Sequence, residues 1–378
     1  MTSPITAITM PKWGLTMTEG KVVRWLQPPG ASFAPGDELL EIETSKITNV
    51  VEAEAPGTLL RVVAPEGSTL PIGALLAVIA PADTPVAEIE AFVSGFVVAE
   101  LADEDAAAGA APAPRSIAVA GRNLRYLELG GGDGVPVLLL HGFGADLNGW
   151  MFNQPVLAEG RRVLALDLPG HGGSARDVGS GDADTLTGAV EGFLAALDPG
   201  PVHLVGHSLG GALAAGLAAR RPDAVASLTL IASAGLGPEI NGAFIEGFVR
   251  AARRKEAVEV LHLLVHDPAL VGRAMVEDVL RYKRLDGVTA ALDSIARAWF
   301  PGGRQANDLV EAITALRVPV QLIWGRDDRI IPVAQAEALA SRLPLHVLDA
   351  TGHLPHMERS AEVNRLLRRF IEACTATS

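Results

Sequence analysis

The sequence has very little cysteine and no long apolar run, and each shortage excludes a class of protein. Its one cysteine, Cys374, excludes an internal disulfide framework and any metal site built from several cysteines, and it fits a reducing compartment. No apolar run approaches the roughly 18 residues needed to cross a bilayer. The first residues, MTSPITAITMPK, lack the charged and apolar regions of a signal peptide. We therefore expect a cytoplasmic protein with no membrane partner.

Positive charge is scarce as well. The chain of 378 residues has 31 Lys plus Arg against 44 Asp plus Glu, which gives a formal net charge of −13. A nucleic-acid-binding surface needs clustered positive charge, so we expect no nucleic-acid partner. No pair of histidines forms an HxxEH-type metal motif, so no metal site is predicted. The length suits roughly two to three domains.

Acidic residues are concentrated in segment 81–114, which has seven of them and no Lys or Arg. Its far end is rich in alanine and proline and too poor in large apolar residues to pack a core. We predict an acidic Ala/Pro-rich linker here, between folded units at 1–80 and 115–378. A short helix is predicted within the linker, because apolar residues from Val86 to Phe96 recur near helical spacing.

The first folded unit contains an internal repeat. A shift of 37 residues places 20–43 over 57–80 with seven identities in 24 positions. The identical pairs are Gly20/Gly57, Arg24/Arg61, Pro28/Pro65, Gly30/Gly67, Gly36/Gly73, Leu39/Leu76 and Ile42/Ile79. Short β-rich runs broken by Pro and Gly predict strands and turns, and two such halves related by a pseudo-two-fold axis predict a small, flattened β-sandwich. Lys46 lies near the midpoint of the repeat, where a turn would place it at a hairpin tip.

Lys46 ends the motif E-x-E-T-x-K, and Pro56 and Gly57 follow it ten and eleven residues later. This sequence resembles the lipoyl domain of 2-oxo acid dehydrogenase-type complexes, over roughly residues 6–80. The resemblance implies that Lys46 carries lipoic acid in amide linkage, attached by a lipoate ligase or lipoyl transferase. Biotin carriers share the fold but usually flank the lysine with methionines, and none adjoins Lys46. The alternative interpretation is an ordinary surface lysine.

From Arg115 onward, buried-strand patterns alternate with helical ones, which is typical of a mostly parallel α/β sheet. The predicted strands read VPVLLLH, RRVLALD, PVHLVGH, ASLTLIA, VPVQLIWG and LHVLDATG. Gly206 to Gly210 form a G-x-S-x-G motif between the third strand and an alanine-rich helix. Glycine on both flanks permits the strained strand-to-helix turn that exposes a nucleophile, so Ser208 is the candidate nucleophile.

Further parts of a nucleophilic site follow other predicted strands. HGFG, residues 141–144, ends the first of these strands, and the N–H groups of Phe143 and Leu209 are the candidate oxyanion donors. WGRDDRIIP ends the fifth strand and contains Asp328, the candidate acid, with Asp327 as its alternative.

His353 follows the last predicted strand and is the candidate base. The order Ser208, Asp328, His353 is that of the α/β-hydrolase fold. The resemblance implies this fold, with a Ser-His-Asp triad, for residues 115–378, and a helical cap over the site at about 237–303.

The other histidines each have a structural interpretation. His207 is expected to flank the site, His141 to orient the oxyanion loop and His171 to be structural, whereas His356 is an alternative base. The remaining histidines belong to no recognisable catalytic or metal-binding motif and are expected to be structural. They are His203, His262, His266 and His346.

A lipoyl domain joined to an α/β-hydrolase domain resembles the acetyltransferase (E2) subunit of acetoin dehydrogenase complexes over the whole chain. The resemblance implies transfer of acetyl from an S-acetyldihydrolipoyl arm to coenzyme A. It also implies an oligomer that works with a thiamine-diphosphate-dependent E1 acetoin dehydrogenase and a dihydrolipoamide dehydrogenase (E3). Ordinary E2 enzymes carry H-x-x-x-D-G, and no histidine here begins that pattern, so the hydrolase domain has to perform the transfer.

Two alternatives remain open from the sequence. One is a hydrolase of thioesters or carbon–carbon bonds that carries a lipoyl domain for another purpose. The other is a lipoyl carrier whose hydrolase domain serves only for docking. The cap also contains two basic clusters, Arg250–Lys255 and Arg281–Arg284, interpreted either as solvated helix faces or as binding sites for coenzyme A phosphates or for the acidic lipoyl domain.

Overall fold

The computed structural model describes residues 5–13, 17–44, 48–53, 55–96 and 112–375. The chain divides into two compact units, the first made mainly of residues up to 111 and the second mainly of residues from 112 onward.

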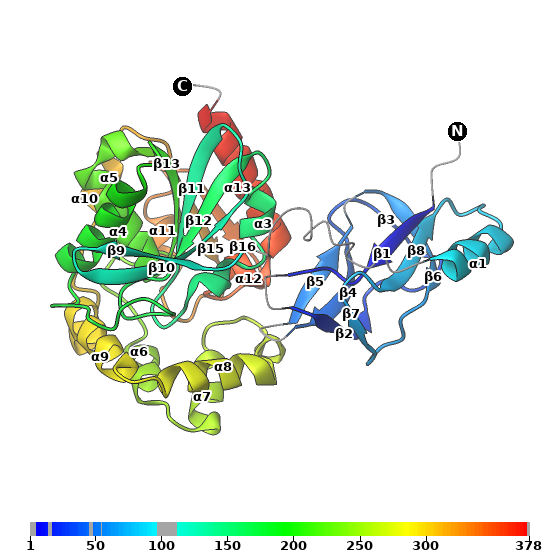
Figure 1. Ribbon diagram of the computed structural model, residues 1–378, viewed down its shortest axis with the longest axis horizontal. Helices are drawn as coiled ribbons and strands as arrows, with labels where there is room; N and C mark the ends of the chain where they lie inside the picture. The colour runs from blue at the N-terminus through cyan, green and yellow to red at the C-terminus, as the bar shows by residue number, and fades with distance from the viewer. Residues whose placement is uncertain (1–4, 14–16, 45–47, 54, 97–111, 376–378) are drawn as a thin grey trace. The chain divides into compact units, whose positions relative to one another are not determined.

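The first unit consists of two four-stranded sheets followed by a helix (Figure 1). Its elements are β1 (Thr6–Thr9), β2 (Glu19–Trp25), β3 (Ser32–Phe33), β4 (Glu38–Glu43), β5 (Thr48–Glu52), β6 (Gly57–Val62), β7 (Thr69–Pro71), β8 (Leu75–Ala80) and α1 (Val86–Gly95). The strand orders are β5-β4-β2-β7 and β1-β8-β6-β3. Alternate side chains from both sheets, such as Val22, Ile42 and Leu59, form a buried core.

The 37-residue repeat corresponds directly to these sheets. Strands β2, β3 and β4 of the first half match β6, β7 and β8 of the second, and the two sheets have equivalent strand orders. The short strand of each half pairs with the opposite half, β3 with β6 and β7 with β2. This exchange joins the two halves, and the predicted flattened β-sandwich is confirmed.

Close packing explains why glycine recurs at the start of each half. A Cβ atom on Gly20 would lie 2.9 Å from Cγ2 of Ile42, and one on Gly57 would lie 2.4 Å from Cγ2 of Ile79. These four residues are two pairs of repeat equivalents, so the same steric limit acts twice.

Helix α1 lies within the segment assigned to the linker. Ile89 of α1 is buried in a small cluster with Leu75 and Val78 of β8. The first unit therefore packs a helix beyond residue 80, and the rest of the linker up to Ala111 lies outside the described residues.

The second unit is built on an eight-stranded sheet. Its strands are β9 (Arg115–Val119), β10 (Arg122–Leu129), β11 (Gly134–Leu140), β12 (Arg161–Leu166), β13 (Val202–His207), β14 (Val225–Ile231), β15 (Val320–Gly325) and β16 (Leu345–Leu348). Their order is β16-β15-β14-β13-β11-β12-β10-β9. The six strands from β16 to β12 pair in parallel, and β10 and β9 pair antiparallel at the far edge. The mostly parallel sheet predicted from the sequence is confirmed.

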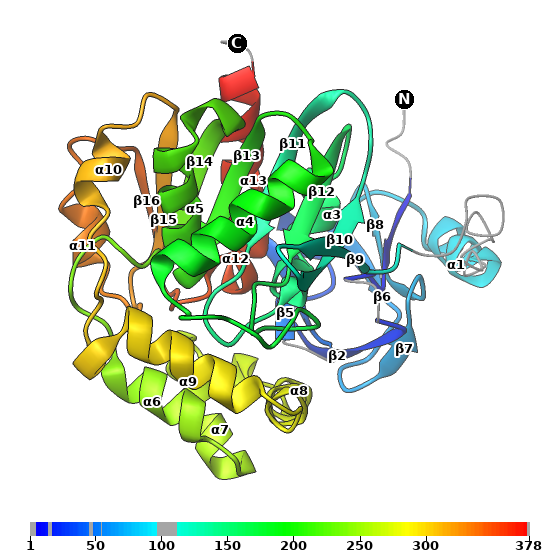
Figure 2. The same cartoon turned by 60° about the vertical axis from the view of Figure 1, so that its left-hand side comes forward.

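Helices cover both faces of this sheet, as a parallel sheet requires (Figures 1 and 2). The helices that flank it are η1 (Leu147–Trp150), α3 (Gln154–Leu157), α4 (Ala183–Leu197), α5 (Leu209–Arg220), η2 (Pro222–Ala224), α10 (Val310–Thr314), α11 (Ala334–Glu337), α12 (Pro355–Glu358) and α13 (Ser360–Thr375). Helices α4 and α5 lie on one face, and α3 and α13 on the other.

The predicted cap is an insertion between β14 and β15. It contains α6 (Gly242–Arg250), α7 (Arg254–Leu261), η3 (Pro268–Leu270), α8 (Arg273–Lys283), α9 (Val288–Trp299) and η4 (Pro301–Gly303). Helices α6 and α9 pack against each other and contact η4. The insertion crosses the carboxyl ends of the sheet strands, where a parallel α/β fold places its site (Figure 2).

Candidate active site

Ser208 lies on a sharp turn between β13 and α5. Its backbone has φ 52° and ψ −119°, a conformation that an L-residue adopts only when the surrounding structure imposes it. A Cβ on Gly206 would lie 2.4 Å from the carbonyl oxygen of Gly210, and one on Gly210 would lie 2.3 Å from that of Leu140. The two motif glycines therefore let the backbone close around the serine, which is the geometry of a nucleophile elbow.

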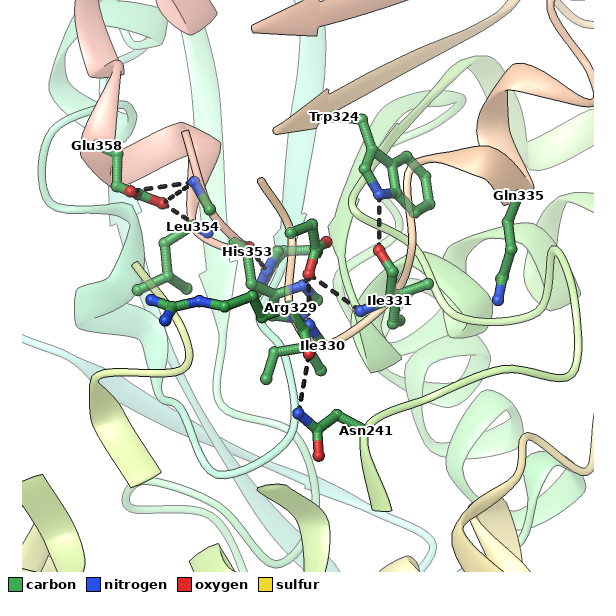
Figure 3. Close-up of polar contacts among 12 residues, drawn as sticks. Asn241, Trp324, Arg329, Ile330, Ile331, Gln335, His353, Leu354 and Glu358 are labelled. Atoms are coloured by element: carbon green, nitrogen blue, oxygen red, sulfur yellow. Dashed lines mark hydrogen bonds and ion pairs between the residues drawn. The ribbon is translucent and has the colours of Figure 1, made fainter. Parts of the chain in front are cut away.

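The candidate acid and base are hydrogen-bonded to each other. His353 Nδ1 donates to Asp328 Oδ2 across 2.8 Å, and both side chains are almost fully buried. The other carboxylate oxygen, Oδ1, accepts from the N–H groups of Ile330 at 2.8 Å and Ile331 at 3.0 Å (Figure 3). Because Nδ1 carries the proton, Nε2 is the nitrogen that accepts one in neutral His353.

His207 connects the serine turn to the histidine loop. Its Nε2 donates to the carbonyl oxygen of His353 across 2.8 Å, and the two rings lie 4.8 Å apart between centroids. On its other side, a Cβ on Gly142 would lie 2.8 Å from Nδ1 of His207 and 3.1 Å from Cβ of Ser208. The structure thus brings the serine, histidine and oxyanion loops together.

The two candidate oxyanion donors lie beside Ser208. Leu209 begins α5, and the first N–H groups of a helix have no intrahelical partner. Within the described part of the chain, the Phe143 N–H donates to no backbone carbonyl. Both residues are buried, so a developing oxyanion there would be held away from bulk water.

Aromatic residues of the cap cover the oxyanion loop. The Phe143 ring packs edge-on against Phe248 of α6, at 6.0 Å between centroids, and against Phe300 at the end of α9, at 6.1 Å. These contacts place apolar groups over the strand ends and restrict the access of water to the site.

His141 orients the oxyanion loop, in agreement with the sequence interpretation. Its Nδ1 donates to the Gly142 carbonyl at 2.8 Å, and its Nε2 accepts from the Leu168 N–H at 3.0 Å. Burial lowers its pKa to about 4, so the ring is neutral and holds one tautomer. His171 packs edge-on against it at 5.1 Å, and burial lowers the pKa of His171 to about 3.

His356, the alternative base, faces the interior. Its ring lies 4.5 Å from that of His207 and 4.6 Å from that of Trp150, between centroids. Burial lowers its pKa to about 3. Since Asp328 pairs with His353, the geometry favours His353 as the base.

Two carboxylates hold loops of the site through hydrogen bonds to backbone N–H groups. Neither of them was identified from the sequence. Asp167, at the end of β12, accepts from the N–H groups of Leu147 and Gly173, each at 2.7 Å. Burial raises its pKa to about 7. Glu358, in α12, accepts from backbone N–H groups on both sides of His353. Their positions in the sequence could have indicated both residues. Asp167 begins the loop sequence DLPGHGGS, and Glu358 follows the predicted base by five residues.

Most residues of the two basic clusters in the cap form hydrogen bonds or ion pairs with other residues of the cap. Lys283 donates to the carbonyl oxygens of Phe248, Val249 and Ala251 at the end of α6, and burial lowers its pKa to about 8. Arg254 pairs with a glutamate at 3.7 Å and Arg281 with an aspartate at 2.8 Å. The clusters are therefore best interpreted as helix caps and solvated ion pairs, and Lys283 in particular is not available to a phosphate.

In the first unit, β4 and β5 form an antiparallel hairpin with Glu43 opposite Thr48. Only residues 44–47 connect the two strands, and Lys46 is the one amine in that connection. Lys46 itself lies outside the described residues.

The described residues contain neither a metal-holding cluster nor a helix fit to cross a membrane. No group of three His, Cys, Asp or Glu side chains among them is arranged to hold a metal ion. None of the helices in these ranges is both long enough and apolar enough to cross a membrane.

Two family models match the chain, one in each unit. The alpha/beta hydrolase fold model matches residues 135–360, and the biotin/lipoyl model, described as biotin-requiring enzyme, matches residues 6–79. A solved meta-cleavage product hydrolase from Pseudomonas fluorescens, 26% identical, superposes with a TM-score of 0.63 over 68% of this chain and 97% of that one. These matches define the class: an α/β-hydrolase fold joined to a lipoyl-type domain.

Two full-length relatives carry both units. The acetyltransferase component of the acetoin-cleaving system of Pseudomonas putida is 46% identical and aligns over 98% of this chain and 99% of its own length. The corresponding component of Cupriavidus necator is 42% identical over 97% of each chain. The chain therefore belongs to the family of dihydrolipoyllysine-residue acetyltransferase components of acetoin-cleaving systems.

Proposed function

We propose that the protein transfers an acetyl group from a dihydrolipoyl arm on Lys46 to coenzyme A, through an acetyl-Ser208 intermediate. The observation that carries the proposal is the buried Asp328–His353 pair beside a serine on a nucleophile elbow, in a chain that also carries a lipoyl-type domain. Full-length relatives named as acetyltransferase components support the reaction type.

Lys46 fits the attachment of lipoic acid because it supplies the one amine in the short connection between β4 and β5. When bound in amide linkage, lipoic acid would supply a cyclic disulfide, whose reduced dihydrolipoyl form carries acetyl as a thioester. The proposed domain limits are 1–80 for the lipoyl domain and 115–378 for the hydrolase domain, with 81–114 between them containing α1 and the acidic linker.

The first half-reaction acylates Ser208. Its Oγ attacks the thioester carbonyl carbon while His353 Nε2 takes the hydroxyl proton, and Asp328 stabilises the resulting imidazolium. The N–H groups of Phe143 and Leu209 hold the tetrahedral oxyanion, each contributing roughly 2.7–4 kcal/mol of transition-state stabilisation. The carbon–sulfur bond then breaks, and the departing thiolate takes the proton from His353.

The second half-reaction reverses these steps with a different thiol. The coenzyme A thiol gives its proton to His353 Nε2, its sulfur attacks the acetyl carbon, and Ser208 Oγ leaves with that proton. Exchange between two thioesters is nearly isoenergetic, so acetyl reaches coenzyme A only if water stays away from the acyl-serine. Phe248 and Phe300 over the oxyanion loop support such exclusion.

The proposal extends to partners and place of action. Relatives that are components of acetoin-cleaving systems support partnership with a thiamine-diphosphate-dependent E1 and with dihydrolipoamide dehydrogenase. A lipoate ligase or lipoyl transferase would modify Lys46, and the protein would act as an oligomer in the cytoplasm.

A hydrolase is the second candidate function. The observation that favours it is the likeness of the second unit to a meta-cleavage product hydrolase. Purified protein incubated with acetyl-dihydrolipoamide and coenzyme A separates the two candidates. The proposal expects acetyl-CoA as the main product, whereas free acetate in the presence of coenzyme A would support the hydrolase.

A further inference from the structure

One segment of the cap, residues 262–266, lies against both the acid loop and the histidine loop. We refer to it as the latch segment. It connects α7 to η3, and it packs so closely on the histidine loop that a Cβ on Gly352 would lie 2.8 Å from the His266 nitrogen. Contacts of this kind are made by the backbone and do not depend on a flexible side chain.

The latch segment holds the histidine loop through two kinds of contact. The His353 N–H donates directly to the Leu264 carbonyl at 2.7 Å. Glu358 accepts from the His266 N–H at 2.7 Å, and also from the N–H groups of Gly352 at 3.0 Å and Leu354 at 3.1 Å (Figure 3). One half-buried carboxylate therefore binds the residues on either side of His353 to the latch segment.

The acid loop is held by the same segment. Arg329, next to Asp328, donates from Nη2 to the carbonyl oxygens of His262 at 2.6 Å and Val265 at 2.5 Å. Its own carbonyl oxygen accepts from Asn241 Nδ2 at 2.9 Å, at the start of α6. Arg329 thus fixes the acid loop to two parts of the cap.

The acid loop follows β15 and the histidine loop follows β16. These contacts attach both loops to the same short segment of the cap. Asp328 and His353 must stay within hydrogen-bond distance for the base to keep its tautomer. A cap segment that binds the neighbours of both residues sets their separation.

We propose that Arg329 and Glu358 are positioning residues, which make the alignment of the Asp328–His353 pair depend on docking of the latch segment. This inference rests on the proposed function insofar as the acyl group is acetyl bound for coenzyme A. The alignment of the Asp328–His353 pair should affect any acylation of Ser208, whatever the acyl group. Each residue acts through the loop that it holds.

The test compares Arg329→Met and Glu358→Gln with two matched controls in full-length protein. Arg326 lies in the same loop as Arg329 and pairs at the surface with Asp349 and Glu337, and Arg326→Met removes these pairs. Glu362→Gln removes a half-exposed glutamate that pairs with Arg365. Arg329→Lys and Glu358→Asp are the conservative variants, which retain charge and provide folded proteins if the first pair does not fold.

Acylation of Ser208 is measured as the burst of nitrophenol from p-nitrophenyl acetate, across pH, beside kcat and KM for acetyl-CoA formation. The proposal expects the burst rate and kcat to fall about 10- to 100-fold in the Arg329 and Glu358 variants, with KM for coenzyme A unchanged. The pH at which the burst rate is half-maximal should also shift, and the conservative variants should recover part of the rate. The two control variants should match the wild type.

Wild-type burst rates and pH profiles in folded Arg329 and Glu358 variants would overturn the proposal, as would equal losses in the controls. Failure of the proposed function is a separate result. If wild-type protein passes acetyl to water rather than to coenzyme A, the burst still measures how the latch segment affects acylation.

Discussion

His353 Nδ1 and Asp328 Oδ2 lie 2.8 Å apart, and the remaining oxygen of Asp328 is occupied by two backbone N–H groups. This arrangement determines what an amide would do in place of the carboxylate. In Asp328→Asn the amide oxygen would keep the backbone donors, so the NH₂ group would face His353. Nδ1 would then have to accept, and the proton would move to Nε2.

We therefore expect Asp328→Asn to lower kcat for acetyl-CoA formation by roughly 10³–10⁴-fold, because the wrong tautomer cannot take the serine proton. The comparison variant is Asp327→Asn, since Asp327 is the alternative acid in the sequence. Asp327 pairs with His266 of the latch segment at 2.9 Å, but both side chains are half-exposed, so this substitution should cost less than about tenfold. Equal losses from both substitutions, measured by steady-state kinetics, would contradict the assignment of the acid.

Two glycine-to-alanine substitutions should have opposite effects on stability. Gly206→Ala places a Cβ 2.4 Å from a backbone oxygen, and we expect loss of folding or of activity. Gly188, inside α4, has open space around the same position. Gly188→Ala should raise the free energy of unfolding by about 0.5–1 kcal/mol, through helix propensity and a smaller loss of backbone entropy. Urea unfolding and activity assays check both, and a stable, active Gly206→Ala protein would show that the elbow is looser than described.

Burial of His356 predicts a pH dependence of stability. Burial lowers its pKa from 6.5 to about 3, so between these values the unfolded chain holds a proton on this ring that the folded chain does not. The free energy of unfolding should therefore fall as the pH falls below 6.5, by about 1.4 kcal/mol per pH unit for this residue.

His356→Phe removes that contribution and keeps an aromatic ring against Trp150. Urea unfolding at pH 7.5 and 5.5 should show the variant losing about 1.4 kcal/mol less than the wild type over this interval. Parallel losses in the two proteins would mean that His356 is already protonated in the folded state or stays neutral in both states.

Lys46 is predicted to be the single lipoylated residue. Intact mass after expression with lipoic acid should show one added lipoyl group, and Lys46→Arg should show none. Lys21→Arg is the matched control, since Lys21 lies on β2 of the same unit and pairs with Glu43. A lipoylated Lys46→Arg protein would contradict the assignment.

Most of the fold was predictable from the sequence. The parallel strands of the second unit are buried on both faces, and the strands of the first unit belong to an internal repeat. The six parallel strands read as continuous apolar runs, and the 37-residue repeat indicated both halves of the sandwich. Strands β9 and β10 were not predicted, since they lie at a sheet edge where half-exposed residues such as Arg122 and Arg125 interrupt the apolar pattern.

The triad was predictable from motifs that each follow a predicted strand. The contacts that Glu358 and Arg329 make with the latch segment were not predictable, because these partners are backbone atoms 64 to 92 residues away. Contacts between side chains and distant backbone leave no pattern in a single sequence. The same reason hid the role of Lys283, whose partners are the last carbonyls of α6.

In the proposed mechanism, Ser208 carries the acetyl group between the two thiols. The direct measurement uses Ser208→Ala protein with Lys46 lipoylated, E1, acetoin and coenzyme A, and follows both acetyl on the lipoyl arm and acetyl-CoA. We expect the lipoyl arm to become acetylated as in the wild type, with no acetyl-CoA formed, since the variant retains the arm but lacks the nucleophile. Acetyl-CoA formation at the wild-type rate in Ser208→Ala would contradict the serine mechanism.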